Sequence, residues 1–578
     1  MDASRAFWKR EKRSFFFLPF VFLLMLLSLG TFGQLGCDDG TDTSSSDGGD
    51  CSDDSADTSS DDGGGCSDDE AETSSSSSGG GCSDDSAETT SGSGGDCSDE
   101  STIVYVGSDG TYRDDDSDCS DDDVENYSSE GGSPPPGGGG GGGGPPPPPP
   151  PSDTPFPTGL AMELVSPALG GAGGTGGSHL PAASEDGRYV VFESDATNLM
   201  AGDSNEMSDI FFYDRKLELM VLVSRGWSGG SNGTSGRACI SADGRYVAYR
   251  SDASNLVSED PNGELTDVFL FDRQSGTTEL ASLGVSGAGA NGQSVAPSIS
   301  ADGRYVAFES SATNLTPGGD LNGSWGDIFV YDRDWNSVER VTLAPGGTAP
   351  NGDSRTPSIS GDGEYVVFDS TATNLIATDG NGFIRDVFVY DRGARTFELV
   401  SLSPDGNGGS GDSEAASLSA DGRYVAFEST AGNLTPSDKN GVVRDIFLYD
   451  RQMRSVSLVS ASLDSNGAAG DSRFASVSSD GRWVAFESVA GDLVPRDEAN
   501  TSDAFVYDRV TRQVVRISTD FDPSSPDGDM PSGQSHYPRI AAGGRYVVFQ
   551  SQATDLIPYD PNGAIDDVFA APNPPGAP

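Results

Sequence analysis

Short apolar runs recur along residues 162–571 at a nearly constant spacing. The stretch 296–343 shows the repeating unit, in which polar segments separate the runs PSIS, RYVAFES, DIFVYDR and VERVTL. Each run is rich in Val, Ile, Tyr and Phe, is bounded by Gly, Asp and Asn, and carries no helical period. Each is therefore expected to form a short β-strand, and we name the four strands A, B, C and D in chain order.

The unit occurs seven times, as the turn between strands A and B shows. Successive turns lie 57, 59, 60, 59, 59 and 63 residues apart. They begin at Asp186, Asp243, Asp302, Asp362, Asp421, Asp480 and Gly543. Seven units of four antiparallel strands predict an all-β protein with the architecture of a seven-bladed β-propeller.

The two ends of the repeat region complement each other. The last copy ends after its third strand, DVFAA (567–571), and so lacks strand D. The segment MELVS (162–166), which precedes the first copy, matches strand D segments such as FELVS (397–401). We therefore expect the N-terminal strand to complete the last blade and close the ring, which removes the exposed sheet edges.

The repeated pattern S-x-D-G-R-Y-V-A-F-E-S followed by D-I-F-V-Y-D-R resembles the repeats of the TolB-like β-propellers, relatives of the WD-repeat proteins. The resemblance covers roughly residues 162–571 and recurs in every copy. It implies a periplasmic or surface propeller that serves mostly in protein interaction, and it supplies no reaction. TolB itself carries an N-terminal α/β domain, whereas a low-complexity tether stands in that place here, so a role in the Tol system does not carry over.

The N-terminus has the features of an export signal. Five basic residues within the first 13 precede the 19-residue apolar run 15–33, which is the pattern of a secretory signal and is also long enough for an uncleaved anchor. The following QLGCDDG resembles the lipobox of bacterial lipoproteins, which implies a signal peptide over 1–36 and lipidation of Cys37. Gln34 departs from the usual Leu, so ordinary cleavage and a retained anchor stay open as alternatives. The expected location is the cell envelope of a bacterium, as a lipid-anchored, periplasmic or surface protein.

Residues 37–158 are rich in Ser, Asp, Gly and Pro and hold few apolar residues, so we expect a disordered tether that carries the propeller domain, 159–578. Five cysteines of the tether open CSDD or CSDE units, which we interpret as tandem expansion rather than as a disulfide framework or a zinc site. The formal net charge of −57 argues against nucleic acid and anionic lipid as partners.

The repeat separates two rims of the propeller. The tight A–B and C–D turns share one rim, and the longer B–C and D–A loops share the other, which we call the long-loop face. Because binding residues concentrate on variable loops held by a rigid scaffold, we expect a protein or a glycan to bind at the long-loop face.

The B–C loops carry the motif D-x-N-G-x-x-x-D in five of the seven copies. Its oxygen-bearing side chains are candidate calcium ligands, since Ca²⁺ takes six to eight oxygens. The alternative is a turn without metal, because Asn-Gly favours turns and Asp caps backbone N–H groups. The final Asp occurs in all seven copies, which favours a backbone role for that position. The candidate ligands are Asp260, Asn262, Asp267, Asp320, Asn322, Asp327, Asp379, Asn381, Asp386, Asp438, Asn440, Asp445, Asp560, Asn562 and Asp567.

A second candidate site lies where the D–A loop enters strand A, the innermost strand of a blade. Aligning the copies puts His179, Arg237, Val295, Arg355, Glu414, Arg473 and His536 in register. The two histidines fall in the first and last copies, which ring closure makes neighbours. The candidate ligand-binding residues His179, Arg237, Arg355, Arg473 and His536 suit an acidic peptide terminus, a sugar acid or a metal, and the alternative is a set of solvated loop positions.

No catalytic constellation emerges, because two histidines leave little material for a triad or a histidine-rich metal site. Calcium is the one candidate cofactor, and the sequence does not indicate an oligomeric state. We expect a protein- or glycan-binding or scaffolding module. A competing hypothesis is a propeller enzyme, a lyase or hydrolase of acidic polysaccharide, with His179 and His536 at the channel. A purely structural envelope propeller is the third.

Overall fold

A computed structural model describes residues 162–573, apart from 172, 202, 204, 228, 229, 321, 324, 378, 498, 499 and 523–529. The predicted signal peptide (1–36), lipidated Cys37 and tether (37–158) lie outside the described residues and stay predictions, as do the domain boundaries. Within the described part, the chain forms 28 strands and two short 3-10 helices, η1 (Leu169–Gly171) and η2 (Val285–Gly287).

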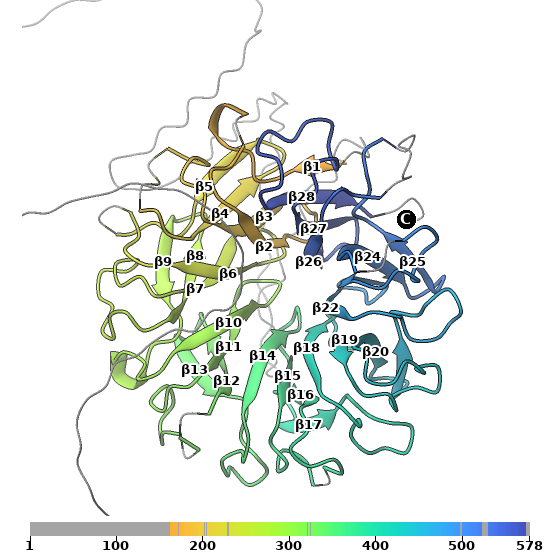
Figure 1. Cartoon of the computed structure of the whole chain (residues 1–578). Helices are drawn as coiled ribbons and strands as arrows, with labels where there is room; N and C mark the ends of the chain where they lie inside the picture. The colour runs from red at the N-terminus through yellow and green to blue at the C-terminus, as the bar shows by residue number, and fades with distance from the viewer. Residues whose placement is uncertain are drawn as a thin grey trace, which may run out of the picture. The chain divides into compact units, whose positions relative to one another are not determined.

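The strands form seven four-stranded antiparallel sheets arranged as blades around a central axis (Figure 1). The predicted seven-bladed β-propeller is therefore confirmed. The innermost A strands of blades 1 to 7 are β2 (Ser178–Ala183), β6 (Ser235–Ile240), β10 (Ser294–Ile299), β14 (Ser354–Ile359), β18 (Ser413–Leu418), β22 (Ser472–Val477) and β26 (Ser535–Ile540). The B strands are β3 (Tyr189–Ser194), β7 (Tyr246–Ser251), β11 (Tyr305–Ser310), β15 (Tyr365–Ser370), β19 (Tyr424–Ser429), β23 (Trp483–Ser488) and β27 (Tyr546–Ser551).

The outer half of each blade consists of strands C and D. The C strands are β4 (Asp209–Asp214), β8 (Asp267–Asp272), β12 (Asp327–Asp332), β16 (Asp386–Asp391), β20 (Asp445–Asp450), β24 (Asp503–Asp508) and β28 (Asp567–Pro572). The D strands are β5 (Leu219–Leu222), β9 (Thr277–Leu280), β13 (Ser337–Arg340), β17 (Thr396–Leu399), β21 (Ser455–Leu458), β25 (Gln513–Arg516) and, for blade 7, β1 (Glu163–Leu164).

The N-terminal strand closes the ring, as predicted. In β1, Glu163 pairs with Ala570 and Leu164 with Phe569, so the first strand of the propeller lies antiparallel to the last. The closure extends into blade 1, where Arg215 forms an ion pair of 2.7 Å with Glu163. Blade 7 therefore has four strands, like the other six blades, and β28 has no exposed outer edge.

The core lies between neighbouring blades and consists mainly of residues from strands B and C. One cluster joins Ala426 and Ile446 of blade 5 to Val484 and Phe486 of blade 6, all fully buried. Within a blade, an aromatic side chain of strand B stacks on one of strand C, as the pair Phe368 and Phe388 does at a centroid distance of 6.1 Å. This packing fixes the blades as a rigid scaffold for the loops at either rim.

The rim of tight turns is engaged in blade-to-blade contacts. In blade 5, Arg423 of the A–B turn pairs with Asp450 at 2.8 Å. Arg451 stacks on the ring of Tyr365 in blade 4, with 4.3 Å from its guanidinium carbon to the ring centroid. Gly422, at φ +67°, lies so close to Tyr365 that an added Cβ would overlap the ring. The repeated arginines of these turns in blade 5 and the tyrosine of the neighbouring blade therefore have structural partners.

Strand A contains a β-bulge in every blade. The register with strand B shifts after the second residue of the strand, and the third residue adopts a positive φ of 47° to 55° without being glycine. These third residues are Leu180, Arg237, Ala296, Thr356, Ala415, Phe474 and Tyr537.

Candidate functional site

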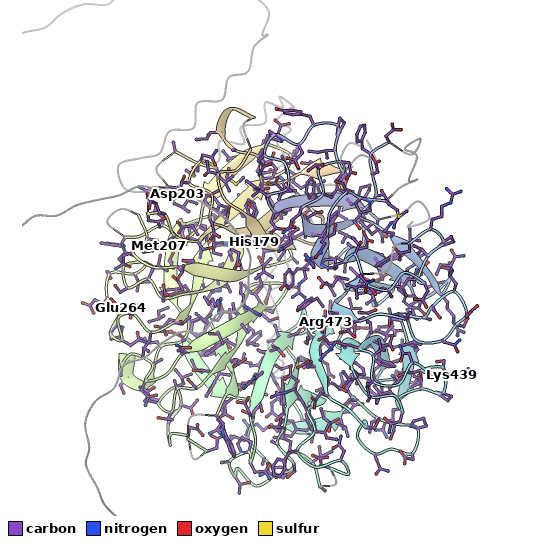
Figure 2. All side chains as sticks on the ribbon, viewed as in Figure 1. His179, Asp203, Met207, Glu264, Lys439 and Arg473 are labelled. Atoms are coloured by element: carbon purple, nitrogen blue, oxygen red, sulfur yellow. The ribbon has the colours of Figure 1, made fainter. Side chains whose placement is uncertain are left out.

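The long-loop face combines an outer ring of B–C loops with an inner ring at the channel mouth. Figure 2 shows His179 and Arg473 near the centre of the propeller, whereas the B–C loop residues Asp203, Glu264 and Lys439 lie at its periphery. The two candidate sites predicted from the sequence are thus separate regions of one face.

The aspartate that begins strand C ties the blade together. In all seven blades its Oδ1 accepts a hydrogen bond of 2.6 to 2.9 Å from a Ser or Thr hydroxyl just after strand D. The same hydroxyl accepts the backbone N–H of the residue after the aspartate, as Ser401 does from Val387. The aspartate therefore acts on the backbone through this hydroxyl, which it orients, and not by accepting that N–H itself. The aspartates are Asp209, Asp267, Asp327, Asp386, Asp445, Asp503 and Asp567.

The first aspartate of the D-x-N-G motif makes a turn. Asp260 Oδ1 accepts backbone N–H groups of Asn262 and Gly263, both at 3.2 Å. Asp560 makes the matching pair of bonds at 3.1 and 3.2 Å. Each of these aspartates therefore stabilises a turn through its Oδ1, as the turn interpretation predicts. The Oδ2 of each carboxylate takes no part in these bonds.

The carboxylates of each loop lie close enough to influence one another. Burial, with a smaller contribution from the nearby charge of Asp260, raises the pKa of Asp267 to about 6, although the hydrogen bond from Ser282 opposes the shift. The same causes raise the pKa of Asp386 and Asp445 to about 6. Each loop thus holds a buried carboxylate whose ionised form needs a compensating positive charge.

The channel mouth holds the second candidate set, with one correction. Strand register places Gly236 opposite Arg250, in the position where His179 lies opposite Glu193, so the alignment of Arg237 with His179 was wrong by one residue. The spacing to the A–B turn gives the correct residue, since Gly236 precedes Asp243 by seven residues, as His179 precedes Asp186, whereas Arg237 precedes it by six. Val295, Arg355, Glu414, Arg473 and His536 occupy the expected register.

The two histidines face carboxylates. His179 Nδ1 lies 3.9 Å from Asp566, and His536 Nδ1 lies 3.5 Å from Glu487. The hydrogen bond to Glu487 raises the pKa of His536, with a smaller contribution from the charge of Asp566. Asp566 therefore lies in the neighbourhood of both imidazoles, as the closed ring predicts.

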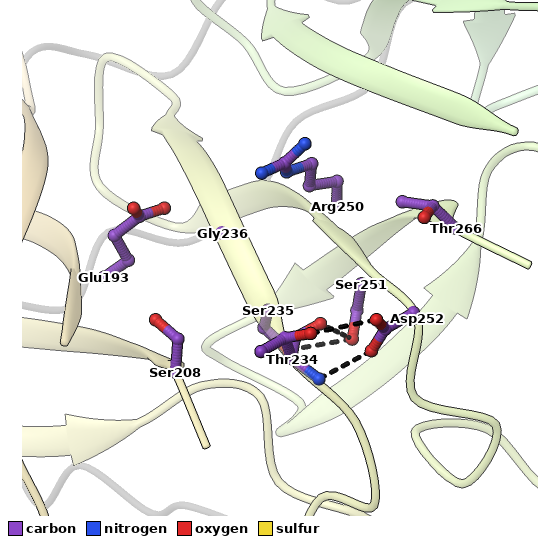
Figure 3. A pocket seen from close by; sticks show the side chains of 9 residues that line it. All are labelled: Glu193, Ser208, Thr234, Ser235, Gly236, Arg250, Ser251, Asp252 and Thr266. Carbon is purple, nitrogen blue, oxygen red and sulfur yellow. Dashed lines mark hydrogen bonds between the residues drawn. The ribbon is translucent and has the colours of Figure 1, made fainter. Parts of the chain in front are cut away.

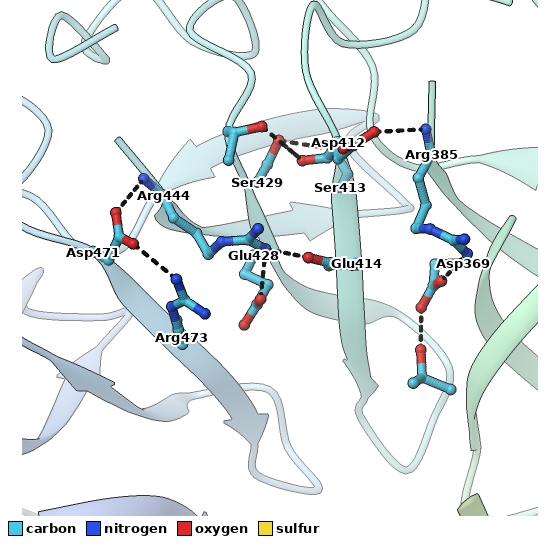
Figure 4. Close-up of polar contacts among 12 residues, drawn as sticks. Asp369, Arg385, Asp412, Ser413, Glu414, Glu428, Ser429, Arg444, Asp471 and Arg473 are labelled. Atoms are coloured by element: carbon cyan, nitrogen blue, oxygen red, sulfur yellow. Dashed lines mark hydrogen bonds and ion pairs between the residues drawn. The ribbon is translucent and has the colours of Figure 1, made fainter. Parts of the chain in front are cut away.

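Two of the predicted arginines pair with carboxylates of their own D–A loops. Arg355 pairs with Asp353, and Arg473 lies 2.9 Å from Asp471 (Figure 4). Two further arginines, each just before strand C, extend this network, since Arg385 contacts Asp369 at 2.7 Å and Arg444 contacts Glu428 at 2.7 Å. On this side of the channel the positive charges are neutralised by the protein.

The sequence analysis missed a ring of acidic side chains at the fifth residue of strand B. Five of the seven side chains at this position accept a backbone N–H from the bulge of the next blade, for example Glu428 from Phe474 at 2.9 Å and Glu487 from Tyr537 at 2.8 Å. The repeated Glu of the FES segments carried the signal for this contact. The ring consists of Glu193, Arg250, Glu309, Asp369, Glu428, Glu487 and Gln550.

Blade 2 breaks this ring, because Arg250 stands where the other blades have a carboxylate or an amide. Its guanidinium forms no hydrogen bond or ion pair with any residue that the structure describes. The neighbouring Gly236 adds no side chain, and a polar cavity of about 280 Å³ opens there, lined by Glu193, Ser208, Thr234, Ser235, Gly236, Arg250, Ser251, Asp252 and Thr266 (Figure 3).

Two more arginines near the mouth lack ion pairs within the described part of the chain. Arg237 follows Gly236 at the bulge and is exposed. Arg539 of strand A in blade 7 is also exposed, and the protein around the channel and the nearby charge of Arg237 lower its pKa. Together with Arg250, they place three arginines without ion pairs among the described residues on strands A and B of blades 2 and 7, where the carboxylates of Glu193 and Asp566 also lie.

Cys239, the one cysteine of the described residues, is structural. Its Sγ contacts the carbonyl of Ala248 at 3.6 Å, and burial raises the pKa of its thiol to about 12. A thiol with such a pKa is a poor nucleophile and metal ligand at neutral pH.

Three solved structures similar to this chain have TM-scores below 0.5, so the assignment to the β-propellers rests on the strand pairing. No family model matches the chain, and no curated relative matches it. TolB from Acinetobacter baumannii is 16% identical, with a TM-score of 0.32 over 67% of this chain and 80% of that one. An oligogalacturonate lyase from Vibrio parahaemolyticus is 12% identical, with a TM-score of 0.42 over 72% and 98% of the two chains. The β-propeller domain of the Trilobed protease from Pyrococcus furiosus is 10% identical, with a TM-score of 0.41 over 68% and 95%.

The class that the fold defines is thus a seven-bladed β-propeller whose last blade is closed by the N-terminal strand. The three similar structures carry different names and activities, and likeness at this level leaves the function to be argued from the site itself.

Proposed function

We propose that this propeller is a binding or scaffolding module whose long-loop face contacts a protein or a glycan, displayed in a bacterial envelope by an N-terminal anchor. The observation that carries the proposal is the distribution of exposed aromatic side chains. Among the described residues more than a third exposed, five aromatics lie on loops of this face and one, Trp335, lies on the opposite rim. The five are Trp227, Trp325, Phe383, Phe521 and Tyr559.

Exposed aromatic side chains on one face favour binding, because flat rings bury large apolar areas at small cost in conformational entropy and stack on sugar rings or partner side chains. The unpaired arginines at the mouth add a preference for an anionic group. Arginine recognises carboxylates through two parallel hydrogen bonds, so an acidic sugar unit or an acidic peptide group suits the cavity beside Arg250.

The test is binding of the full chain to arrays of acidic and neutral glycans and to purified envelope proteins. A Trp227→Ala/Phe383→Ala double variant is expected to lose the partner, whereas Trp335→Ala on the opposite rim is expected to keep it. Equal binding by both variants would place the contact elsewhere. Equal affinity for neutral and acidic ligands would contradict the proposed preference of the arginines for an anionic group.

A second candidate function is an enzyme acting on acidic polysaccharide. It rests on the two imidazoles, each beside a carboxylate, since such pairs perform general acid and base catalysis. Turnover that disappears in a His179→Ala/His536→Ala variant, with ligand binding kept, would favour the enzyme. Absence of turnover on a panel of acidic polysaccharides, with binding present, would favour the binding module.

A further inference from the structure

The last residue of strand D distinguishes the blades from one another. Strand pairing places it in one register in all seven, opposite a phenylalanine of strand C. It is leucine in five blades and arginine in two. In the order of the blades the residues are Leu222, Leu280, Arg340, Leu399, Leu458, Arg516 and Leu164.

In blade 3 the arginine lies within the B–C loop motif. Arg340 Nη1 is 2.9 Å from Asp320 Oδ1, and its Nη2 is 2.8 Å from Asp327 Oδ2 and 3.1 Å from Asn322 Oδ1. The side chains of Arg340 and Asp320 are each 4% exposed. One buried positive group therefore contacts one oxygen from each of the three conserved positions of D-x-N-G-x-x-x-D, which shows that these oxygens converge on a point.

Blade 6 repeats the arrangement despite its altered loop. Arg516 Nη1 lies 3.2 Å from Asp497 and 3.9 Å from Asp503, whose side chains are 1% and 3% exposed. Blade 6 is thus the second blade with arginine in place of the strand D leucine, and its arginine also lies beside two buried carboxylates. Two independent copies of the repeat supply a positive charge at the same place.

Blades 2, 4, 5 and 7 keep the three oxygen-bearing residues and have leucine on strand D. In blade 2, Asp267 is fully buried, and neither its Oδ2 nor Asn262 Oδ1 has a hydrogen-bond partner among the described residues. Asp386 Oδ2 with Asn381 Oδ1 in blade 4, and Asp567 Oδ2 with Asn562 Oδ1 in blade 7, repeat this. A buried carboxylate oxygen without a partner costs free energy unless a cation compensates it.

The asparagine adapts to the charge beside it. In blade 3 its oxygen accepts from the guanidinium of Arg340, whereas in blade 5 Asn440 Nδ2 donates to Asp445 Oδ2 at 2.6 Å. In blade 5, Asn440 Oδ1 and Asp438 Oδ1 are the buried oxygens without a partner in the described chain. The two ends of an amide have the same shape, so rotation about its last bond presents either a donor or an acceptor to the centre of the loop.

We propose that the B–C loops of blades 2, 4, 5 and 7 each bind one Ca²⁺ at the place where Arg340 and Arg516 supply a guanidinium in blades 3 and 6. The described residues contain no group of three or more His, Cys, Asp or Glu side chains suited to a metal, and each proposed set has two carboxylates and one amide. Such all-oxygen donors select a hard cation, and backbone carbonyls or water complete its shell. The ligands are Asp260, Asn262 and Asp267; Asp379, Asn381 and Asp386; Asp438, Asn440 and Asp445; and Asp560, Asn562 and Asp567.

Blade 1 is not included in the proposal. It keeps Asp203, Asn205 and Asp209, but its motif is one residue shorter and lacks the glycine, and residue 204 lies outside the described part of the chain.

The test exchanges the residue on strand D, because the two blade types predict opposite results. Leu399→Arg should place a guanidinium in the loop of blade 4 and lower the bound calcium by one ion per chain. Arg340→Leu should remove the internal cation of blade 3 and raise the bound calcium by one. Thr396→Arg adds the same charge at an exposed position of the same strand and should leave the calcium content unchanged.

Bound calcium is measured on the full chain by equilibrium dialysis at fixed free Ca²⁺, with folding of each variant checked by circular dichroism. The acidic N-terminal residues bind calcium equally in every variant, so the differences between variants report the propeller alone. Melting in Ca²⁺, in Mg²⁺ and in chelator is the second readout, and Ca²⁺ is expected to raise the melting temperature well above both other conditions. Equal calcium content in wild type, Leu399→Arg and Arg340→Leu would overturn the proposal, as would a melting temperature that Mg²⁺ raises as far as Ca²⁺ does. These results do not depend on which partner the long-loop face binds.

Discussion

The carboxylate of Glu428 in blade 5 accepts a hydrogen bond of 2.9 Å from the backbone N–H of Phe474, which lies in blade 6 at a positive φ of 55°. The bulge that requires this backbone conformation turns its N–H toward the preceding blade. A glutamate of strand B makes this link in four pairs of neighbouring blades, and the repetition of the glutamate in the sequence reflects this structural duty.

Removing this link is expected to destabilise the propeller. Glu428→Ala leaves the buried N–H of Phe474 without its acceptor and takes one of two carboxylate partners from Arg444. The free energy of unfolding should fall by about 1–3 kcal/mol, the usual cost of an unsatisfied buried group. Denaturant unfolding measures it, and Glu364→Ala, at an exposed position of a tight turn, is the control expected to change little.

Restoring the acidic ring in blade 2 should separate binding from stability. In Arg250→Glu the new carboxylate stands where its counterparts accept a bulge N–H from the next blade, so stability should rise by about 0.5–1.5 kcal/mol. Binding of acidic ligands should weaken at least tenfold, because the unpaired guanidinium beside the cavity is replaced by a negative charge. Unchanged affinity measured by calorimetry would show that Arg250 does not contact the ligand.

The pKa of His536 offers a direct measurement, because the chain contains only two histidines. Its hydrogen bond to Glu487 raises its pKa above the ordinary value of 6.5, so proton NMR should show one histidine titrating above this value and Glu487→Gln should lower it. A raised pKa in the folded state means that the contact stabilises fully below the unfolded-state pKa. This stabilisation is lost as the pH rises through the folded-state pKa. The stability difference between wild type and His536→Gln should accordingly shrink as the pH rises from about 5.5 to 8. A difference that grows instead would contradict the ion pair.

The closing blade should respond more strongly than an internal blade to one identical change. Ser166→Ala removes the hydroxyl that joins strand D to Asp567 in blade 7, and Ser401→Ala removes its equivalent in blade 4. Each should cost about 1–3 kcal/mol. Ser166→Ala should also expose the N-terminal strand to proteolysis, since β1 has only two paired residues. Equal protease sensitivity of the two variants would show that the closure is held by other contacts.

The sequence was sufficient for the architecture because strand periodicity and turn chemistry repeat with the blades. It also indicated the missing strand D and its replacement by residues 162–166. The presence of the aspartate before strand C in all seven copies indicated a structural role, and its partner proved to be a hydroxyl after strand D.

The details of the site depend on contacts between distant residues, which periodicity does not report. The β-bulge that follows the second residue of strand A in each blade leaves the repeat spacing unaltered, so periodicity did not reveal it. Arg340 reaches its B–C loop from strand D, 18 residues after Asn322, and nothing in the local pattern of VERVTL distinguishes a buried arginine from an exposed one. The last residue of strand D has the same register in every blade, and only the structure shows that an arginine there contacts the carboxylates of the B–C loop.

The closure of the ring has a mechanical consequence. All of the chain before residue 162 leaves the propeller through β1, so tension transmitted from an anchored N-terminus would act first on the two paired residues of that strand. The ion pair of Glu163 with Arg215 and the hydrogen bond of Ser166 to Asp567 would bear this load before any other blade did. Detachment of β1 would expose the outer edge of β28 while six complete blades remained, so tension on the residues before β1 would uncover a free strand edge at one defined place on the ring.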